Sequence, residues 1–102
     1  MTVYNNHNLY DRSNTAIADN MVRKYSKTDA TPDMIYIDYG VNLFRKQALG
    51  LIPENQYCSL ETLFPQLIAA NELLAYEVRE RFYEIGSLNG ITEFTNYIEG
   101  RK

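Results

Sequence analysis

The sequence predicts an α/β fold, with a partial mixed β-sheet that contains a β-hairpin and is flanked by helices. Three observations lead to this class. Residues 34–45 are rich in β-branched and aromatic side chains, as in a strand in the middle of a sheet. Two later segments repeat apolar residues at helical spacing, and each follows a serine that can cap a helix. Asp19-Asn20 separates two strand-like runs, as in a tight hairpin turn.

The length and composition of the chain indicate which class of protein it belongs to. A chain of 102 residues predicts one domain, residues 1–102, with a single modest core. A net charge of -3 argues against a general nucleic-acid-binding protein, which normally carries a basic patch. The sequence has neither a membrane-length apolar run nor a signal peptide, and its single cysteine, Cys58, fits a reducing compartment. We therefore expect a cytoplasmic protein that binds neither nucleic acid nor a membrane.

Most of the strands are predicted in the first half of the chain. Residues 1–4 form a short strand candidate, and residues 15–25 form the hairpin, with a bulge in its second strand. Apolar residues occupy nearly every position of residues 34–45, so we expect a strand that is buried on both faces. Gly40 interrupts it, which marks either a bulge or a place where a ligand approaches the backbone.

The next part of the sequence predicts two helical segments and a strand. Residues 47–52 form a short helix or helical turn before Pro53. Ser59 is expected to cap a helix over residues 60–71, and Asn71 is expected to end it in a left-handed conformation. Residues 73–78 then form a strand.

A strand, a turn and a helix close the chain. The strand-like run of residues 76–85 stops at Gly86, and Ser87 offers its side-chain oxygen to the free N–H groups of a new helix. This helix repeats apolar residues at helical spacing, namely Leu88, Ile91, Phe94 and Ile98. Glu84 thus stands where a strand ends, and ligands of open α/β folds usually bind at such positions.

Three motifs resemble those of one enzyme family. Residues 37–41 read IDYGV, residues 59–67 read SLETLFPQL, and residues 82–90 read FYEIGSLNG. They are similar, in this order, to the "(I/L)D-x-G-(V/L)", "(D/S)-L-E-x-L-(F/Y)-P-x-L" and "F-(Y/W)-(D/E)-I-G-(S/T)-P-x-G" motifs of sugar-1-phosphate nucleotidyltransferases, also called sugar-nucleotide pyrophosphorylases. Residues 1–27 resemble the upstream "MTV-x-(R/K)-N…SN…V-x-x-Y-x-K" segment, so the resemblance covers nearly the whole chain.

The resemblance extends to only part of the family fold. Family members are longer, and their N-terminal half carries a glycine-rich "GG-x-GTR" loop that binds the nucleotide phosphates. The five glycines of this chain are scattered singly. The resemblance therefore implies the sugar-phosphate-binding C-terminal half of a Rossmann-like nucleotidyltransferase fold, without the N-terminal nucleotide-binding part. Either a second polypeptide supplies that part, or this chain cannot catalyse the reaction.

The resemblance assigns catalytic roles to two residues. The family reaction joins a nucleoside triphosphate and a sugar 1-phosphate into a nucleoside diphosphate sugar and releases pyrophosphate, with Mg²⁺ as cofactor. Lys27 matches the lysine that holds the sugar phosphate, and Glu84 matches the position of a metal-binding aspartate. The alternatives are a solvated loop lysine and a carboxylate that the helix dipole stabilises.

Three further residues match substrate contacts of the family. Gly40 corresponds to a glycine whose backbone lies against the sugar, and its alternative is a strand bulge. Asn14 belongs to the "SN" pair, which can equally be a turn at the start of a strand. Glu61 is a sugar contact by resemblance or an acid that suits the first turn of a helix, and the latter interpretation is favoured.

Three hypotheses about function remain. In the leading one, the chain is the sugar-phosphate and metal half of a nucleotidyltransferase and is inactive alone, which implies a sugar 1-phosphate and a separate nucleotide-binding chain as partners. The alternative is a non-catalytic assembly or regulatory domain, or a truncated relic of such an enzyme. The third is an unrelated α/β binding module. A half-sheet leaves an open strand edge and an uncovered apolar face, so we expect a homo-oligomer.

Overall fold

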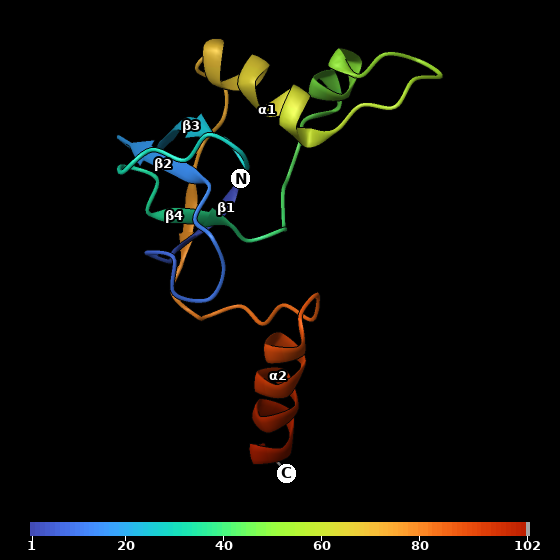
Figure 1. Cartoon of the computed structure of the whole chain (residues 1–102). Helices are drawn as coiled ribbons and strands as arrows, with labels where there is room; N and C mark the ends of the chain where they lie inside the picture. Colours follow the sequence, from blue (N-terminus) through green and yellow to red (C-terminus); the bar gives the residue numbers. More distant parts are fainter. Residues whose placement is uncertain (102) are drawn as a thin grey trace.

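The computed structural model describes residues 1–101 as a mixed five-stranded sheet with flanking helices, which confirms the α/β prediction (Figure 1). The strands are β1 (Thr2–Asn5), β2 (Thr15–Ala18), β3 (Met21–Tyr25), β4 (Tyr36–Asp38) and β5 (Tyr76–Val78). The helices are a 3₁₀ helix η1 (Lys46–Leu51), α1 (Leu60–Ala69) and α2 (Leu88–Gly100). None of the helices within residues 1–101 is long and apolar enough to span a membrane.

The sheet has the strand order β3-β2-β4-β1-β5 and curls, so that Met21 at the start of β3 forms a bridge with Leu74 just before β5. Strand β1 pairs antiparallel with β4 and parallel with β5, while β2 pairs antiparallel with both β3 and β4. The curl brings the β2–β3 turn beside the chain that enters β5. There the amide of Val22 donates to the carbonyl of Leu73 (2.9 Å) and the amide of Ala75 donates to the carbonyl of Asn20 (2.9 Å).

The structure confirms both the turn and the bulge that were predicted for the hairpin. Asp19 and Asn20 both have positive φ, 54° and 61°, which is the backbone conformation that a two-residue hairpin turn requires. The register between β2 and β3 shifts between Ala16 and Ile17, which is the expected bulge.

The prediction of one long, doubly buried strand over residues 34–45 is wrong. Strand β4 covers Tyr36–Asp38 alone, although it does lie in the middle of the sheet. The Asp38 carboxylate accepts a hydrogen bond from the amide of Gly40 (3.0 Å), and Gly40 has a φ of 85°, so the chain turns out of the sheet here. Leu43 beyond the turn is 96% exposed.

The strand-like run of residues 76–85 is also shorter than predicted. Strand β5 ends at Val78, which pairs with Tyr4, and its partner β1 ends one residue later. The residues that follow are held by aromatic contacts instead. The ring of Phe82 packs edge-on against Tyr4, Tyr10 and Tyr39 at centroid distances of 5.9, 5.8 and 6.2 Å.

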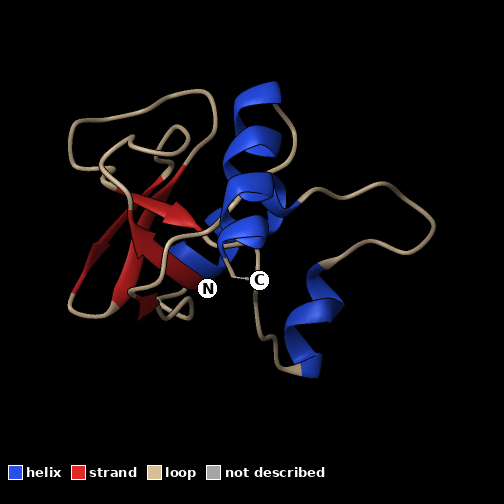
Figure 2. Ribbon diagram, turned by 90° about the horizontal axis from the view of Figure 1, so that it is seen from below, coloured by secondary structure: helices blue, strands red, loops and turns tan. Residues whose placement is uncertain are grey.

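Helix α1 forms the core with the curled sheet. Its buried residues Leu63, Phe64 and Leu67 pack with Val3, Val22 and Leu73. The side chain of Ser59 makes no capping hydrogen bond, contrary to the prediction, and its backbone carbonyl accepts from the amide of Thr62 instead. Asn71 follows the helix with a φ of 55°, the left-handed conformation that was predicted. Figure 2 shows the strands gathered on one side and the helices on the other.

Helix α2 forms where the sequence predicts it, but its apolar face is not buried within the described chain. Figure 1 shows α1 and η1 at one end of the molecule and α2 extending away from the other. Gly90 is the only buried residue of α2. The apolar residues of its predicted stripe are all exposed, namely Leu88, Ile91, Phe94 and Ile98.

We predict that Phe64→Ala destabilises the protein by about 3–5 kcal/mol, because it empties a fully buried site in a small core. Urea unfolding followed by circular dichroism measures this change. Tyr57→Ala, at a side chain that is 95% exposed, is the control and should change stability by less than about 0.5 kcal/mol. Equal effects of the two substitutions would contradict the assigned core.

Candidate functional site

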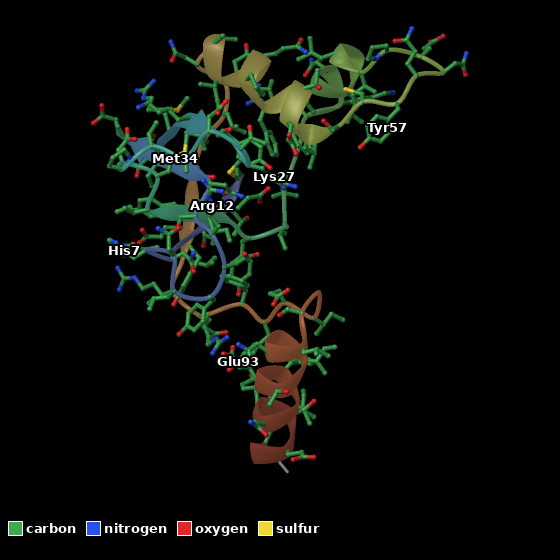
Figure 3. The ribbon with its side chains drawn as sticks, viewed as in Figure 1. His7, Arg12, Lys27, Met34, Tyr57 and Glu93 are labelled. Carbon is green, nitrogen blue, oxygen red and sulfur yellow. The ribbon has the colours of Figure 1, made fainter. Side chains whose placement is uncertain are left out.

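The first group of predicted site residues lies where β3 and α1 approach each other. Lys27 follows β3 by two residues, and its Nζ lies 3.9 Å from Oε1 of Glu61 in the first turn of α1. Figure 3 shows Lys27 beside the sheet, below α1. Both side chains are about half exposed, so the ion pair contributes at most about 1 kcal/mol to stability. The Lys27 ammonium therefore remains accessible to an anion from solvent.

Asn14 joins the start of β2 to β4 and to Ser26, which follows β3 and precedes Lys27. Its carbonyl accepts from the amide of Ser26 (3.0 Å), and its own amide donates to the carbonyl of Tyr36 (2.9 Å). Its side-chain Oδ1 accepts from the amide of Asp38 (3.0 Å) and from the Thr15 hydroxyl (2.8 Å). These hydrogen bonds are a structural reason for an asparagine at position 14. Among residues 1–101 its Nδ2 has no acceptor, so this amide group remains able to donate to a ligand.

Gly40 lies in the exposed turn that follows β4. A Cβ built on Gly40 would meet no atom within 4 Å, so solvent lies against its backbone. Its positive φ shows that a turn already requires glycine here. The position is therefore open to a ligand, but the turn alone accounts for the residue type.

Tyr25 adds a hydroxyl that the sequence analysis did not assign to the site. Its ring packs edge-on against Phe64 at 4.8 Å. Burial, followed by the negative charges of Asp38 and Glu61, raises the pKa of Tyr25 to about 12. The hydroxyl thus stays protonated near two carboxylates. No local sequence pattern predicts the raised pKa of Tyr25, because Asp38 and Glu61 come close to Tyr25 only in the folded chain.

Glu84 belongs to a second group, at the start of α2. Its Oε2 accepts from the amide of Gly86 (3.0 Å), and its Oε1 accepts from the Ser87 hydroxyl (2.6 Å). The Ser87 oxygen in turn accepts from the amide of Gly90 (3.0 Å), which confirms the predicted helix cap. A Cβ on Gly90 would overlap the backbone oxygen of Glu84, so the turn requires glycine there.

Glu84 fits a magnesium site as one ligand among several. Each carboxylate oxygen accepts one hydrogen bond from the protein and keeps a further lone pair. Within residues 1–101 no three His, Cys, Asp or Glu side chains are close enough to hold a metal. Magnesium often takes one or two carboxylates and completes its shell with water and phosphate oxygens. Glu84 fits such a role, with the other ligands coming from elsewhere.

Arg81 attaches the start of α2 to the loop between β1 and β2, and the sequence analysis did not identify it. Its guanidinium carbon lies 3.7 Å from the ring centroid of Tyr10 and 4.0 Å from that of Tyr83. Its Nη2 lies 2.8 Å from Oε2 of Glu93, which Figure 3 places near the end of α2 closest to the sheet. Tyr10 is far from Arg81 in sequence, so no short sequence motif predicts this contact.

The end of β4 lies between the two groups. The amide of Asp38 is hydrogen-bonded to Asn14 on one side, and the Tyr39 hydroxyl donates to the carbonyl of Glu80 (3.3 Å) on the other. Among residues 1–101 no hydrogen bond or ion pair joins Glu84 directly to Lys27. The structure thus pairs Lys27 with Glu61 and bonds the backbone of Asn14 to Ser26, the residue before Lys27, whereas Glu84 belongs to the separate cap of α2.

Comparisons of the chain with protein-family models, with curated proteins and with solved structures gave no match. The relation to sugar-1-phosphate nucleotidyltransferases therefore stays a prediction, which rests on the motifs at residues 37–41, 59–67 and 82–90.

We predict that Gly90→Ala disrupts the cap of α2, at a cost of about 1–3 kcal/mol, because the new methyl group would overlap Glu84. Amide hydrogen exchange measured by NMR should show lost protection in α2. Gly100→Ala is the matched control, since a Cβ there meets nothing within 4 Å, and it should leave α2 unchanged or more stable. Intact protection in the Gly90 variant would contradict the assigned cap.

We predict that Tyr25 contributes to the loss of stability in alkaline solution. Because its folded pKa of about 12 exceeds that of an unfolded tyrosine, about 10, the unfolded state loses the phenolic proton first. The contribution of Tyr25 is complete below pH 10 and falls as pH rises toward 12. Urea unfolding at pH 9 and at pH 11 should show a smaller difference for Tyr25→Phe than for the wild type. Equal differences would contradict the raised pKa.

Proposed function

We propose that this chain is the sugar-phosphate-binding half of a cytoplasmic sugar-1-phosphate nucleotidyltransferase, with the C-terminal half of the Rossmann-like family fold. The observation that carries the proposal is the accessible Lys27 ammonium beside Glu61. An anion binds best where a cation is available and neutral donors are close. The free amide group of Asn14 and the protonated hydroxyl of Tyr25 are such donors.

The residues of this chain bind and orient the sugar phosphate. Lys27 exchanges its long contact with Glu61 for the phosphate, as a mobile point charge. Glu61 is then free to accept a hydrogen bond from a sugar hydroxyl. The open backbone at Gly40 leaves room for the sugar ring. Holding the phosphate in place is the main contribution to such a reaction, which depends on positioning and on charge stabilisation.

Glu84 would supply one ligand to Mg²⁺. When bound, the ion would neutralise the negative charge that develops on the phosphate oxygens. Because the same carboxylate caps α2, metal binding would draw on lone pairs that the Gly86 amide and the Ser87 hydroxyl leave free. The nucleotide and its glycine-rich loop would come from a separate chain, so catalysis is expected only in that complex.

We predict saturable binding of glucose 1-phosphate or mannose 1-phosphate, measured by isothermal titration calorimetry with and without Mg²⁺. Lys27→Ala should weaken binding by about 10- to 100-fold, because it removes a charged hydrogen bond. The matched control is Lys24→Ala, since Lys24 is similarly exposed but pairs with Asp33 at 3.0 Å. This control should leave the affinity unchanged.

A second pair of variants tests the metal role of Glu84. Glu84→Ala and Ser87→Ala both weaken the cap of α2, but only the first removes a carboxylate. Loss of the Mg²⁺ dependence in the Glu84 variant alone would support a metal ligand. If a folded wild-type protein binds neither sugar phosphate at millimolar concentration, the proposal is wrong, and an assembly domain or relic becomes the better interpretation.

A further inference from the structure

A surface hollow of about 460 Å³ lies between the loop that joins β1 to β2 and the segment that joins β3 to β4. Arg12 lines it from the loop, and Ala30, Thr31, Pro32 and Met34 line it from the segment. Arg12 and Met34 are labelled in Figure 3. None of the site residues predicted from the sequence lines this hollow, so the sugar-phosphate proposal does not use it.

Two buried polar side chains hold the loop against the segment. Asn6 is fully buried and Ser13 is 2% exposed. The Ser13 hydroxyl accepts from Nδ2 of Asn6 (3.0 Å) and from the amide of Asn8 (2.9 Å), and it donates to the carbonyl of Ile35 (3.3 Å). The amides of Asn6 and His7 donate to the same carbonyl (2.9 and 2.8 Å). Because these buried groups are all hydrogen-bonded, the hollow has its shape before a ligand enters.

Arg12 is the only charged residue in the lining that the structure describes. Within residues 1–101 its guanidinium has neither an ion pair nor a hydrogen bond. The nearby acids are engaged elsewhere, since Oδ1 of Asp11 accepts from the backbone amide of Arg12 (2.8 Å) and Asp33 pairs with Lys24 (3.0 Å). The hollow is therefore positive, although the chain has a net charge of -3.

The lining also offers N–H groups that are not used. Oδ1 of Asn8 accepts from the amide of Ser13 (2.7 Å), whereas Nδ2 of Asn8 has no acceptor in the described part of the chain. The amides of Ala30 and Thr31 likewise have no acceptor there. The Thr31 hydroxyl is engaged, because it donates to Asp33. A cation with spare N–H donors around it suits a ligand that only accepts hydrogen bonds, which is an anion.

We propose that this hollow binds a carboxylate, with the guanidinium of Arg12 donating to both of its oxygens. The planar fork of arginine matches the two oxygens of a carboxylate, and one guanidinium balances its single charge. A phosphate monoester carries about -1.5 to -2 and would leave negative charge unbalanced. Ala30, Pro32 and Met34 give the hollow an apolar wall, which suits an acid with a small apolar group beside the carboxylate.

A titration of the full chain with N-acetyl-leucine tests the proposal, because this probe joins one carboxylate to one apolar side chain. Two-dimensional ¹H–¹⁵N NMR should show saturable shifts of the amides of Arg12, Ala30 and Thr31. We expect a dissociation constant in the millimolar range, as for a single charged contact. N-acetyl-leucinamide, which lacks the charge, should bind at least about 10-fold more weakly.

Three variants locate the site. Arg12→Ala should weaken binding of N-acetyl-leucine at least about 10-fold, and Arg12→Lys should restore only part of the affinity, because it keeps the charge but not the fork. Ala30→Glu should weaken binding at least as much as Arg12→Ala, because it places a negative charge in the wall. Both positions are exposed, so these variants should fold. Arg79→Ala, at an exposed arginine outside the hollow, is the matched control and should bind as the wild type does.

The same carboxylate can belong to a free small acid or to the C-terminus of a peptide. Comparison of N-acetyl-leucine with the peptide acetyl-Gly-Gly-Leu distinguishes these sources. Tighter binding of the peptide would indicate a chain terminus, whereas equal binding would indicate a free acid, and either result supports the carboxylate site.

The proposal is wrong if the probe causes no saturable shifts at tens of millimolar, if the neutral amide binds equally well, or if Arg12→Ala binds the probe normally. Lys27→Ala should leave the affinity for N-acetyl-leucine unchanged, since Lys27 does not line the hollow. A loss of affinity in that variant would show that the acid binds beside Glu61 instead, and would also contradict the proposal. The inference does not require that the chain binds a sugar phosphate.

Discussion

The position of the Phe64 side chain is the constraint on which most of this structure depends. Its ring is fully buried and contacts Tyr25 at the end of β3 and Phe44 in the segment after β4, at centroid distances of 4.8 and 6.3 Å. One side chain thereby holds helix α1 against the sheet and against the segment that follows β4. The ion pair between Lys27 and Glu61 forms only because these elements are fixed in this way. The candidate site is therefore a consequence of the core and has little packing of its own.

Helix α2 is attached by a different kind of interaction. Its contacts with the rest of the chain are the Glu84–Ser87–Gly90 cap, the ion pair of Arg81 with Glu93, and the packing of Tyr83 on Phe94 and Tyr97. The remainder of its apolar face is exposed. Elements with few buried apolar contacts open at lower free energy than a core helix. A helix held in this way keeps its direction but can adjust when a partner covers its apolar face.

The candidate site residues lie in two separate parts of the molecule. Lys27 and its neighbours lie where β3 and α1 meet, whereas Glu84 lies at the start of α2. Glu84 caps α2 and would also supply a metal ligand. A metal at Glu84 would draw electron density from the cap, so ion binding and the position of α2 are expected to influence each other.

The sequence alone determined the features that depend on a few neighbouring residues. Asp19-Asn20 adopts the turn conformation that its residue types favour, Ser87 caps α2, and Asn71 ends α1 in the left-handed region. The tertiary structure decided where strands end and which side chains meet. Strand β5 stops at Val78, one residue before its partner β1 ends, although apolar residues continue beyond it. The pKa of Tyr25 and the position of Arg81 likewise depend on residues that are distant in the chain. Local backbone preference acts over a single turn, whereas strand length and side-chain surroundings are set by pairing and packing between remote segments.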